Sequence, residues 1–119
     1  MVKLLIKEML DKKSANQAYI DLEKLGNKAV PYIIMQMNDY RELGQKSISF
    51  QNRSLNMFEG IVHYSPQKVI DLLSILLNRI ENENFYVELA NGGSEIQRKN
   101  VIKAWITWLS IKEKEKGDR

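Results

Sequence analysis

Apolar residues recur along this chain with the spacing of one face of an α-helix, and this pattern restricts the fold more than any other feature. Val2, Leu5, Ile6 and Met9 occupy positions i, i+3, i+4 and i+7. The same spacing returns within residues 15–22, 30–37, 69–76 and 102–109, and more weakly within residues 55–62. The pattern predicts about six amphipathic helices and an all-α fold.

Capping residues mark the start of two of these helices. Ser14 with Gln17, and Ser94 with Gln97, have the spacing of a capping box, in which the two side chains satisfy each other's backbone N–H groups. We therefore expect one helix to begin at Ser14 and the last helix to begin at Ser94.

Glycine and proline mark other boundaries. Gly26 lies where a helix end favours a residue that tolerates a left-handed conformation. Pro31 and Pro66 are predicted in the first turns of helices, where a missing N–H costs nothing. Residues 44–54 and 82–94 are polar connections.

A strand is suggested only by Phe85–Leu89, within the second connection. A strand without a partner is not stable, so a short helix or an ordered loop is expected there.

The composition fits one globular domain spanning residues 1–119. A chain of 119 residues can bury one core, and its 44% hydrophobic content is too high for a disordered protein. The absence of cysteine excludes a disulfide framework and fits a reducing compartment. No apolar run approaches the roughly 20 residues of a membrane span, and Lys7 interrupts the apolar N-terminus, so no signal peptide is expected. These features predict a cytoplasmic protein, with residues 111–119 as a frayed, charged tail.

The charge is distributed unevenly. The net charge is +3 and the isoelectric point is near 9.1, but residues 71–96 carry five acids and one arginine. From Gln97 onward there are seven bases and three acids. The chain is therefore bipolar, and its net charge is a weak argument for nucleic-acid binding.

Helical segments also repeat at an offset of about 36 residues, as in stacked helical hairpins. Leu22, Leu25, Pro31, Ile34 and Met37 align at that offset with Phe58, Ile61, Gln67, Ile70 and Leu73. One hairpin cannot bury its apolar face alone, so such hairpins stack.

Two segments resemble a known family. The stretch from Ala18 to Met37 resembles a junction between HEAT repeats, where one helix ends at Leu-Gly and the next opens with Ala-Val-Pro. Residues 97–109 resemble the tryptophan-containing end helix of small bacterial HEAT-like proteins. The middle pair departs from the family pattern, because it lacks the glycine and has Gln67 in place of the proline. The resemblance implies a short right-handed stack of about three hairpins that binds proteins without catalysis.

Catalytic, metal and cofactor sites are not expected. His63 is the only histidine, and Glu59 lies one helical turn before it, but no nucleophile accompanies them and two such groups are too few for a metal site. Asn91–Ser94 precedes a helix start that would attract anions, yet it has neither phosphate-binding glycine motif and is explained by a capped turn.

The acidic connection is the candidate binding surface. Aromatic residues beside acids make good interface anchors, and acids favour a basic partner. The residues concerned are Asp71, Glu81, Glu83, Phe85, Tyr86, Glu88 and Glu95. The leading hypothesis is an inhibitor or immunity protein that neutralises a toxin, for example a nuclease, by blocking its surface.

Two alternatives remain open. One is a scaffold or adaptor subunit of a larger assembly. The other is a nucleic-acid binder through the basic last helix, where a basic stripe lies among two tryptophans that are otherwise expected in the core. These residues are Arg98, Lys99, Lys103 and Lys112, with Trp105 and Trp108. An enzyme is not expected, and the sequence does not indicate the oligomeric state.

Overall fold

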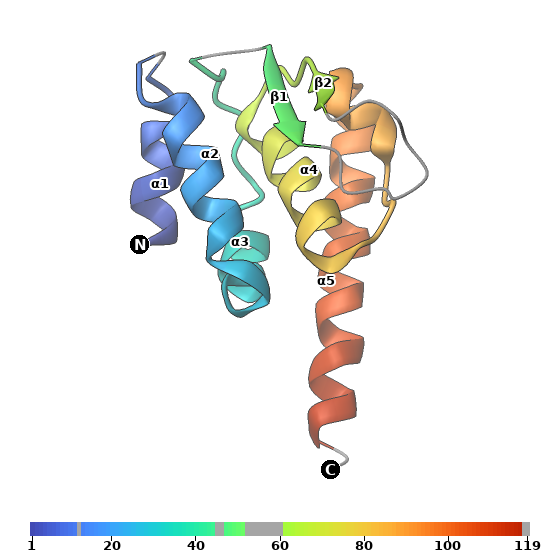
Figure 1. Ribbon diagram of the computed structural model, residues 1–119. Helices are drawn as coiled ribbons and strands as arrows, with labels where there is room; N and C mark the ends of the chain where they lie inside the picture. The colour runs from blue at the N-terminus through green and yellow to red at the C-terminus, as the bar shows by residue number, and fades with distance from the viewer. Residues whose placement is uncertain (12, 45–46, 52–60, 118–119) are drawn as a thin grey trace.

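The computed structural model describes residues 1–11, 13–44, 47–51 and 61–117, and it confirms the predicted all-α fold (Figure 1). The α-helices are α1 (Val2–Glu8), α2 (Ala15–Lys24), α3 (Val30–Met35), α4 (Val69–Glu81) and α5 (Glu95–Gly117). Two 3₁₀ helices, η1 (Gly26–Ala29) and η2 (Val87–Asn91), precede α3 and α5. One short antiparallel hairpin joins β1 (Ile48–Gln51) to β2 (Ile61–Tyr64).

Helix α4 is the centre of the core. Every residue from Val69 to Leu77 is buried, so this helix is surrounded on all sides. It contacts α2, α3 and α5, and Figure 1 shows it between α2 and α5. The buried apolar residues of all these helices form one continuous cluster.

A buried ion pair ties α5 to α4. Arg98 Nε lies 2.8 Å from Asp71 Oδ1 and Arg98 Nη2 lies 2.9 Å from Asp71 Oδ2. Asp71 Oδ2 also accepts hydrogen bonds from the backbone N–H groups of Gln67 and Lys68, each at 3.1 Å. The hydrogen bonds to Asp71 raise the pKa of the Arg98 guanidinium above its ordinary value. Both charges are thus paired and hydrogen-bonded, which buried charges require.

Both predicted helix starts are confirmed, since α2 begins at Ala15 and α5 at Glu95, but only one of the two capping boxes is present. The Ser94–Gln97 capping box is confirmed, with Gln97 N–H donating to Ser94 Oγ at 3.1 Å and Ser94 N–H donating to Gln97 Oε1 at 2.8 Å. The Ser14–Gln17 box is wrong. Ser14 Oγ instead donates to the carbonyl of Glu8 at 2.8 Å, because the chain turns back against the end of α1 there.

Glycine and proline act as predicted at one of the two junctions. Gly26 has φ of +71° just after α2, and Pro31 lies in the first turn of α3. Pro66 is not in a first turn, because α4 begins at Val69 and its start is capped by Asp71.

The weak helix predicted near residues 55–62 is wrong at its described end. Residues 61–64 form β2, whose register pairs Ile48 with Tyr64 and Gln51 with Ile61. His63 therefore lies in a strand and not at a helix end. Residues 52–60, including Glu59 and Phe58, are outside the described residues. The short helix or ordered loop expected at residues 85–89 is confirmed, since η2 begins at Val87.

The C-terminal residues continue α5. The helix runs as far as Gly117, and the side chains of residues 111–115 are exposed, as expected for a solvated tail. Its 23 residues span about 35 Å, and its last turns extend past the rest of the molecule (Figure 1). Among the described helices, none has both the length and the apolar character to cross a membrane.

Removing one partner of the buried ion pair is expected to destabilise the protein strongly. Arg98→Ala leaves the Asp71 carboxylate buried without its cation, and we expect the free energy of unfolding to fall by about 3 to 5 kcal/mol. Urea denaturation followed by circular dichroism measures this change. Lys99→Ala is the matched control, because Lys99 is exposed and pairs only loosely with Glu95 at 3.8 Å. A loss for Arg98→Ala no larger than the control's would contradict a role for this pair in holding α5.

Candidate functional site

The connection between α4 and α5 is held rigidly by Asn78. The Asn78 side-chain amide makes two hydrogen bonds to the backbone of Phe85. Its Nδ2 donates to the Phe85 carbonyl at 2.9 Å, and its Oδ1 accepts from the Phe85 N–H at 3.1 Å, as a neighbouring strand would. Two residues of this connection, Asn82 and Tyr86, have positive φ of 56° and 47°. The surrounding contacts therefore fix a backbone that would otherwise be strained.

The structure brings together four of the predicted binding residues. Glu81, Glu83, Phe85 and Tyr86 are all half-buried and lie in or just before this connection. Glu95 is exposed at the start of α5 and lies 3.8 Å from Lys99. The side chain of Glu88 is outside the described residues.

Asp71 does not belong to the predicted binding surface. It is fully buried and paired with Arg98, so it cannot meet a partner. The same pair removes Arg98 from the predicted basic stripe, of which Lys99, Lys103 and Lys112 remain exposed. Sequence position alone made both residues look like members of surface clusters, because a pair 27 residues apart leaves no local signal.

Three aromatic rings form a row beside this connection, with the buried ring in the middle. Phe85 packs edge-on against Trp105 with ring centroids 4.8 Å apart, and Trp105 packs against Trp108 at 5.4 Å. Trp105 is fully buried, as predicted for a core tryptophan, whereas Trp108 is half-buried. Lys112 Nζ lies 5.7 Å from the centroid of Trp108, within the range of a cation–π contact.

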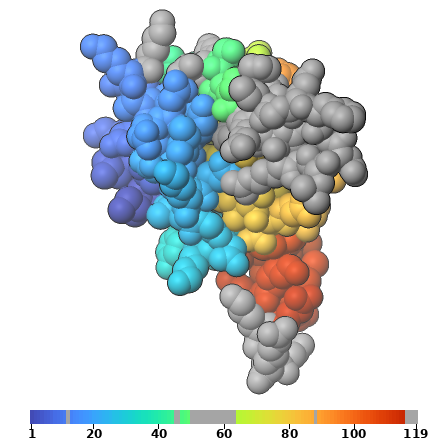
Figure 2. Space-filling model, in the orientation of Figure 1, coloured from blue at the N-terminus to red at the C-terminus, as the bar shows by residue number. Residues whose placement is uncertain are grey.

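Trp108 separates two depressions along α5. The first, here called the α5 groove, has a volume of about 470 Å³. It is lined by Phe85, Tyr86, Asn100, Lys103, Ala104, Thr107, Trp108 and Ile111. The second, here called the notch, has a volume of about 500 Å³ and lies where α5 leaves the body near η1 and α4 (Figure 2). Its lining includes Lys28, Pro31, Glu81, Trp108, Leu109 and Lys112.

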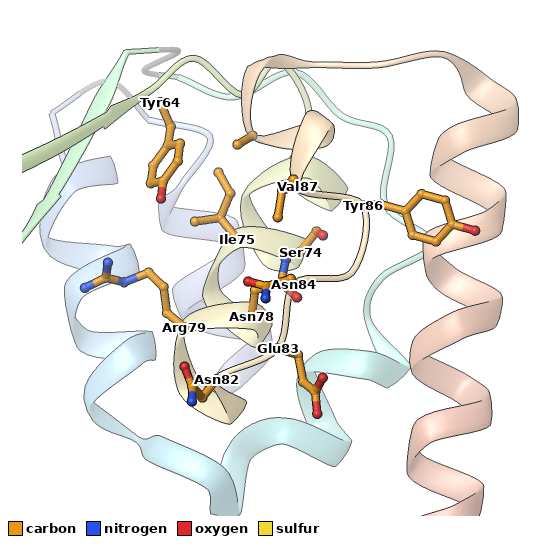
Figure 3. A pocket seen from close by; sticks show the side chains of 11 residues that line it. Tyr64, Ser74, Ile75, Asn78, Arg79, Asn82, Glu83, Asn84, Tyr86 and Val87 are labelled. Atoms are coloured by element: carbon orange, nitrogen blue, oxygen red, sulfur yellow. The ribbon is translucent and has the colours of Figure 1, made fainter. Parts of the chain in front are cut away.

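A further pocket of about 420 Å³ lies behind the same connection (Figure 3). Two of its polar side chains, Arg79 and Asn78, are engaged with other parts of the protein. The guanidinium of Arg79 turns toward α2, where its Nε donates to Glu23 at 2.8 Å, and the ring of Tyr86 turns away toward α5. Asn78 is bonded to Phe85 as described. These two side chains therefore serve the structure of the connection and its packing against α2.

One buried hydroxyl in this pocket is unusual. Ser74 is 1% exposed, and its Oγ has no hydrogen-bond partner among the described residues. A buried polar atom without a partner costs stability, so this position is a weak point in α4.

The described residues give no support to a metal site or to a phosphate site at the turn before α5. No group of three His, Cys, Asp or Glu side chains there could hold a metal ion. The glycine turn before α5 is shaped by its backbone and by packing, since Gly92 has φ of +86° and a Cβ at Gly93 would lie 2.5 Å from Leu89. The start of α5 is already capped by Ser94 and Gln97.

Comparisons with known proteins return no match of this chain to a protein-family model, a curated protein or a solved structure.

Replacing the unpartnered hydroxyl is expected to stabilise the protein. Ser74→Ala removes a buried group that pays for desolvation without a hydrogen bond, and we expect a gain of about 1 kcal/mol in the free energy of unfolding. The gain is measured by urea denaturation against Ser110→Ala, an exposed serine in α5 that has the same change in helix propensity. A Ser74→Ala variant less stable than the wild type would show that the hydroxyl is bonded in solution.

Proposed function

We propose that this chain is a non-catalytic, cytoplasmic protein-binding module whose contact surface is the α5 groove. The observation that carries the proposal is Trp108, a half-buried ring that lies between two depressions on a helix extending beyond the body. Large aromatic side chains in partly desolvated pockets contribute most of the affinity in protein interfaces.

The surroundings of Trp108 support this assignment. Ile111 is 52% exposed and lines the same groove, so an apolar centre is in contact with water. The same groove also has three polar lining residues, which are Asn100, Lys103 and Thr107. An apolar centre with a polar edge is the usual composition of a protein interface.

The finer proposal is that the partner is a basic toxin domain and that binding neutralises it. Glu81 lines the notch, which shares Trp108 with the α5 groove, and Glu83 lines the pocket behind the connection, which shares Tyr86 with it. Complementary charge speeds association, which benefits an inhibitor that must act before its target does damage. The resemblance of Ala18–Met37 to a HEAT-repeat junction implies protein binding, but the predicted 36-residue repeat is wrong at Ile61, which lies in β2, whereas its counterpart Leu25 ends α2.

Binding of nucleic acid receives less support from the geometry. Arg98 is withdrawn from the basic stripe by Asp71, and Lys99 lies 3.8 Å from Glu95. The remaining bases, Lys103 and Lys112, are few for a surface that must neutralise phosphates.

Two isoleucines of α5 provide a matched test of the groove. Ile111 is 52% exposed and lines the groove, whereas Ile106 is 54% exposed and does not line it. We expect Ile111→Asp to weaken capture of a partner from cells by about tenfold or more, because it places a charge in the apolar centre. Quantitative affinity capture with isotope labels compares the two variants. Equal retention of the same partner by Ile111→Asp and Ile106→Asp would exclude the groove as its binding site.

The charge of the partner is tested separately. We expect the double substitution Glu81→Lys with Glu83→Lys to slow association with a basic partner, with a smaller difference at high salt. Surface plasmon resonance with the captured partner measures the association rate. Lys114→Glu is the control in the opposite direction, because Lys114 is exposed on α5 and lines neither depression, and it should leave the rate unchanged or raise it. A faster rate for the double variant would reject a basic partner while leaving the groove itself in place.

A further inference from the structure

A second apolar depression lies at the other end of the molecule, between α1 and α3. It has a volume of about 430 Å³. We call it the N-terminal groove, and its lining consists of Met1, Val2, Lys3, Tyr32, Met35 and Gln36. None of these residues lines the α5 groove or the notch, so this surface is separate from the proposed one.

The apolar side chains of this groove are unusually exposed. Met1, Tyr32 and Met35 are 80%, 61% and 72% exposed, and Leu4, which lies in α1 outside the groove lining, is 57% exposed. Adjacent apolar side chains with this exposure mark interaction sites on proteins, whereas isolated ones do not. Methionine also adapts its shape to different partners, which suits a binding surface.

The charge around the groove has one sign. Lys3 lines it, and Lys7 lies one helical turn further along the same face of α1. No acidic residue lines the groove among the described residues, and α3 carries no charged residue. The one acid of α1, Glu8, is its last residue. An occupant with acidic residues beside an apolar stripe would therefore complement this surface.

The size of the groove fits a short helix. The depression has a volume of about 430 Å³ between two helices, which leaves room for side chains of an occupant. Its lining comes from Met1 with the start of α1 and from the end of α3. It therefore accommodates about one turn of a helix with apolar residues at i, i+3 and i+4.

We propose that the N-terminal groove binds an acidic amphipathic helix of a second protein partner. Its apolar stripe lies against Tyr32 and Met35, and its acids lie beside Lys3 and Lys7. This inference goes beyond the proposed function, since the chain would then hold two partners on two separate surfaces.

The test uses a synthetic helical peptide, held in shape by a hydrocarbon staple, with a leucine stripe and flanking glutamates. Fluorescence anisotropy measures its affinity, and NMR locates it on the protein. We expect saturable binding with shifts at Tyr32, Met35 and Gln36, and an affinity about tenfold lower for Met35→Glu. Ile96→Glu is the matched control, because Ile96 is also 72% exposed but lies on α5. Tyr32→Glu is a second variant, should Met35→Glu alter the fold.

Several results would overturn the proposal. They are no binding of the peptide, equal losses for Met35→Glu and Ile96→Glu, or equal affinity of a peptide with lysines in place of the glutamates. Binding to phosphatidylserine vesicles that Met35→Glu abolishes would assign the groove to a membrane. Dimerisation in sedimentation experiments that the same variant abolishes would assign it to a second copy of this chain. Each of these experiments leaves the Ile111 comparison on the α5 groove unaffected.

Discussion

The carboxylate of Asp71 holds the two halves of this structure together. It caps the N-terminus of α4 by accepting hydrogen bonds from the backbone N–H groups of Gln67 and Lys68. It also binds α5 through two nitrogens of the Arg98 guanidinium, Nε and Nη2. The position of α5 in turn sets the aromatic row and both depressions beside Trp108. An apolar pair of similar size could match the stability, but the forked geometry also defines one orientation of the helix.

The sequence predicted the helices where apolar spacing and capping agreed, as at Ser94 with Gln97. It did not predict the hairpin, because Ile61 and Val62 also fit a helical spacing and the pairing of residues 48–51 with 61–64 is non-local. The residues that it proposed for binding include Glu81, Glu83, Phe85 and Tyr86, which lie together at the connection between α4 and α5. It also counted Asp71 and Arg98 as surface residues, since burial depends on contacts that the local pattern does not contain.

The two proposed binding surfaces follow from an imbalance between helix length and core size. The core covers α4 from Val69 to Leu77, but α5 is longer than the body that it packs on, and α1 and α3 are short and leave apolar residues exposed. Apolar side chains therefore remain in water at both ends of the molecule. Two such ends would suit the adaptor alternative, and the acids near α5 would suit the proposed inhibitor.

Both tryptophans of the chain lie in α5, one enclosed and one beside the surface depressions. The ultraviolet emission of the protein therefore originates almost entirely from this single helix. Detachment of α5 would change the fluorescence of Trp105 and Trp108 together, whereas binding of a partner at the α5 groove would change mainly that of Trp108. The two tryptophans are therefore intrinsic fluorescence probes. They distinguish detachment of α5 from binding of a partner without an added label.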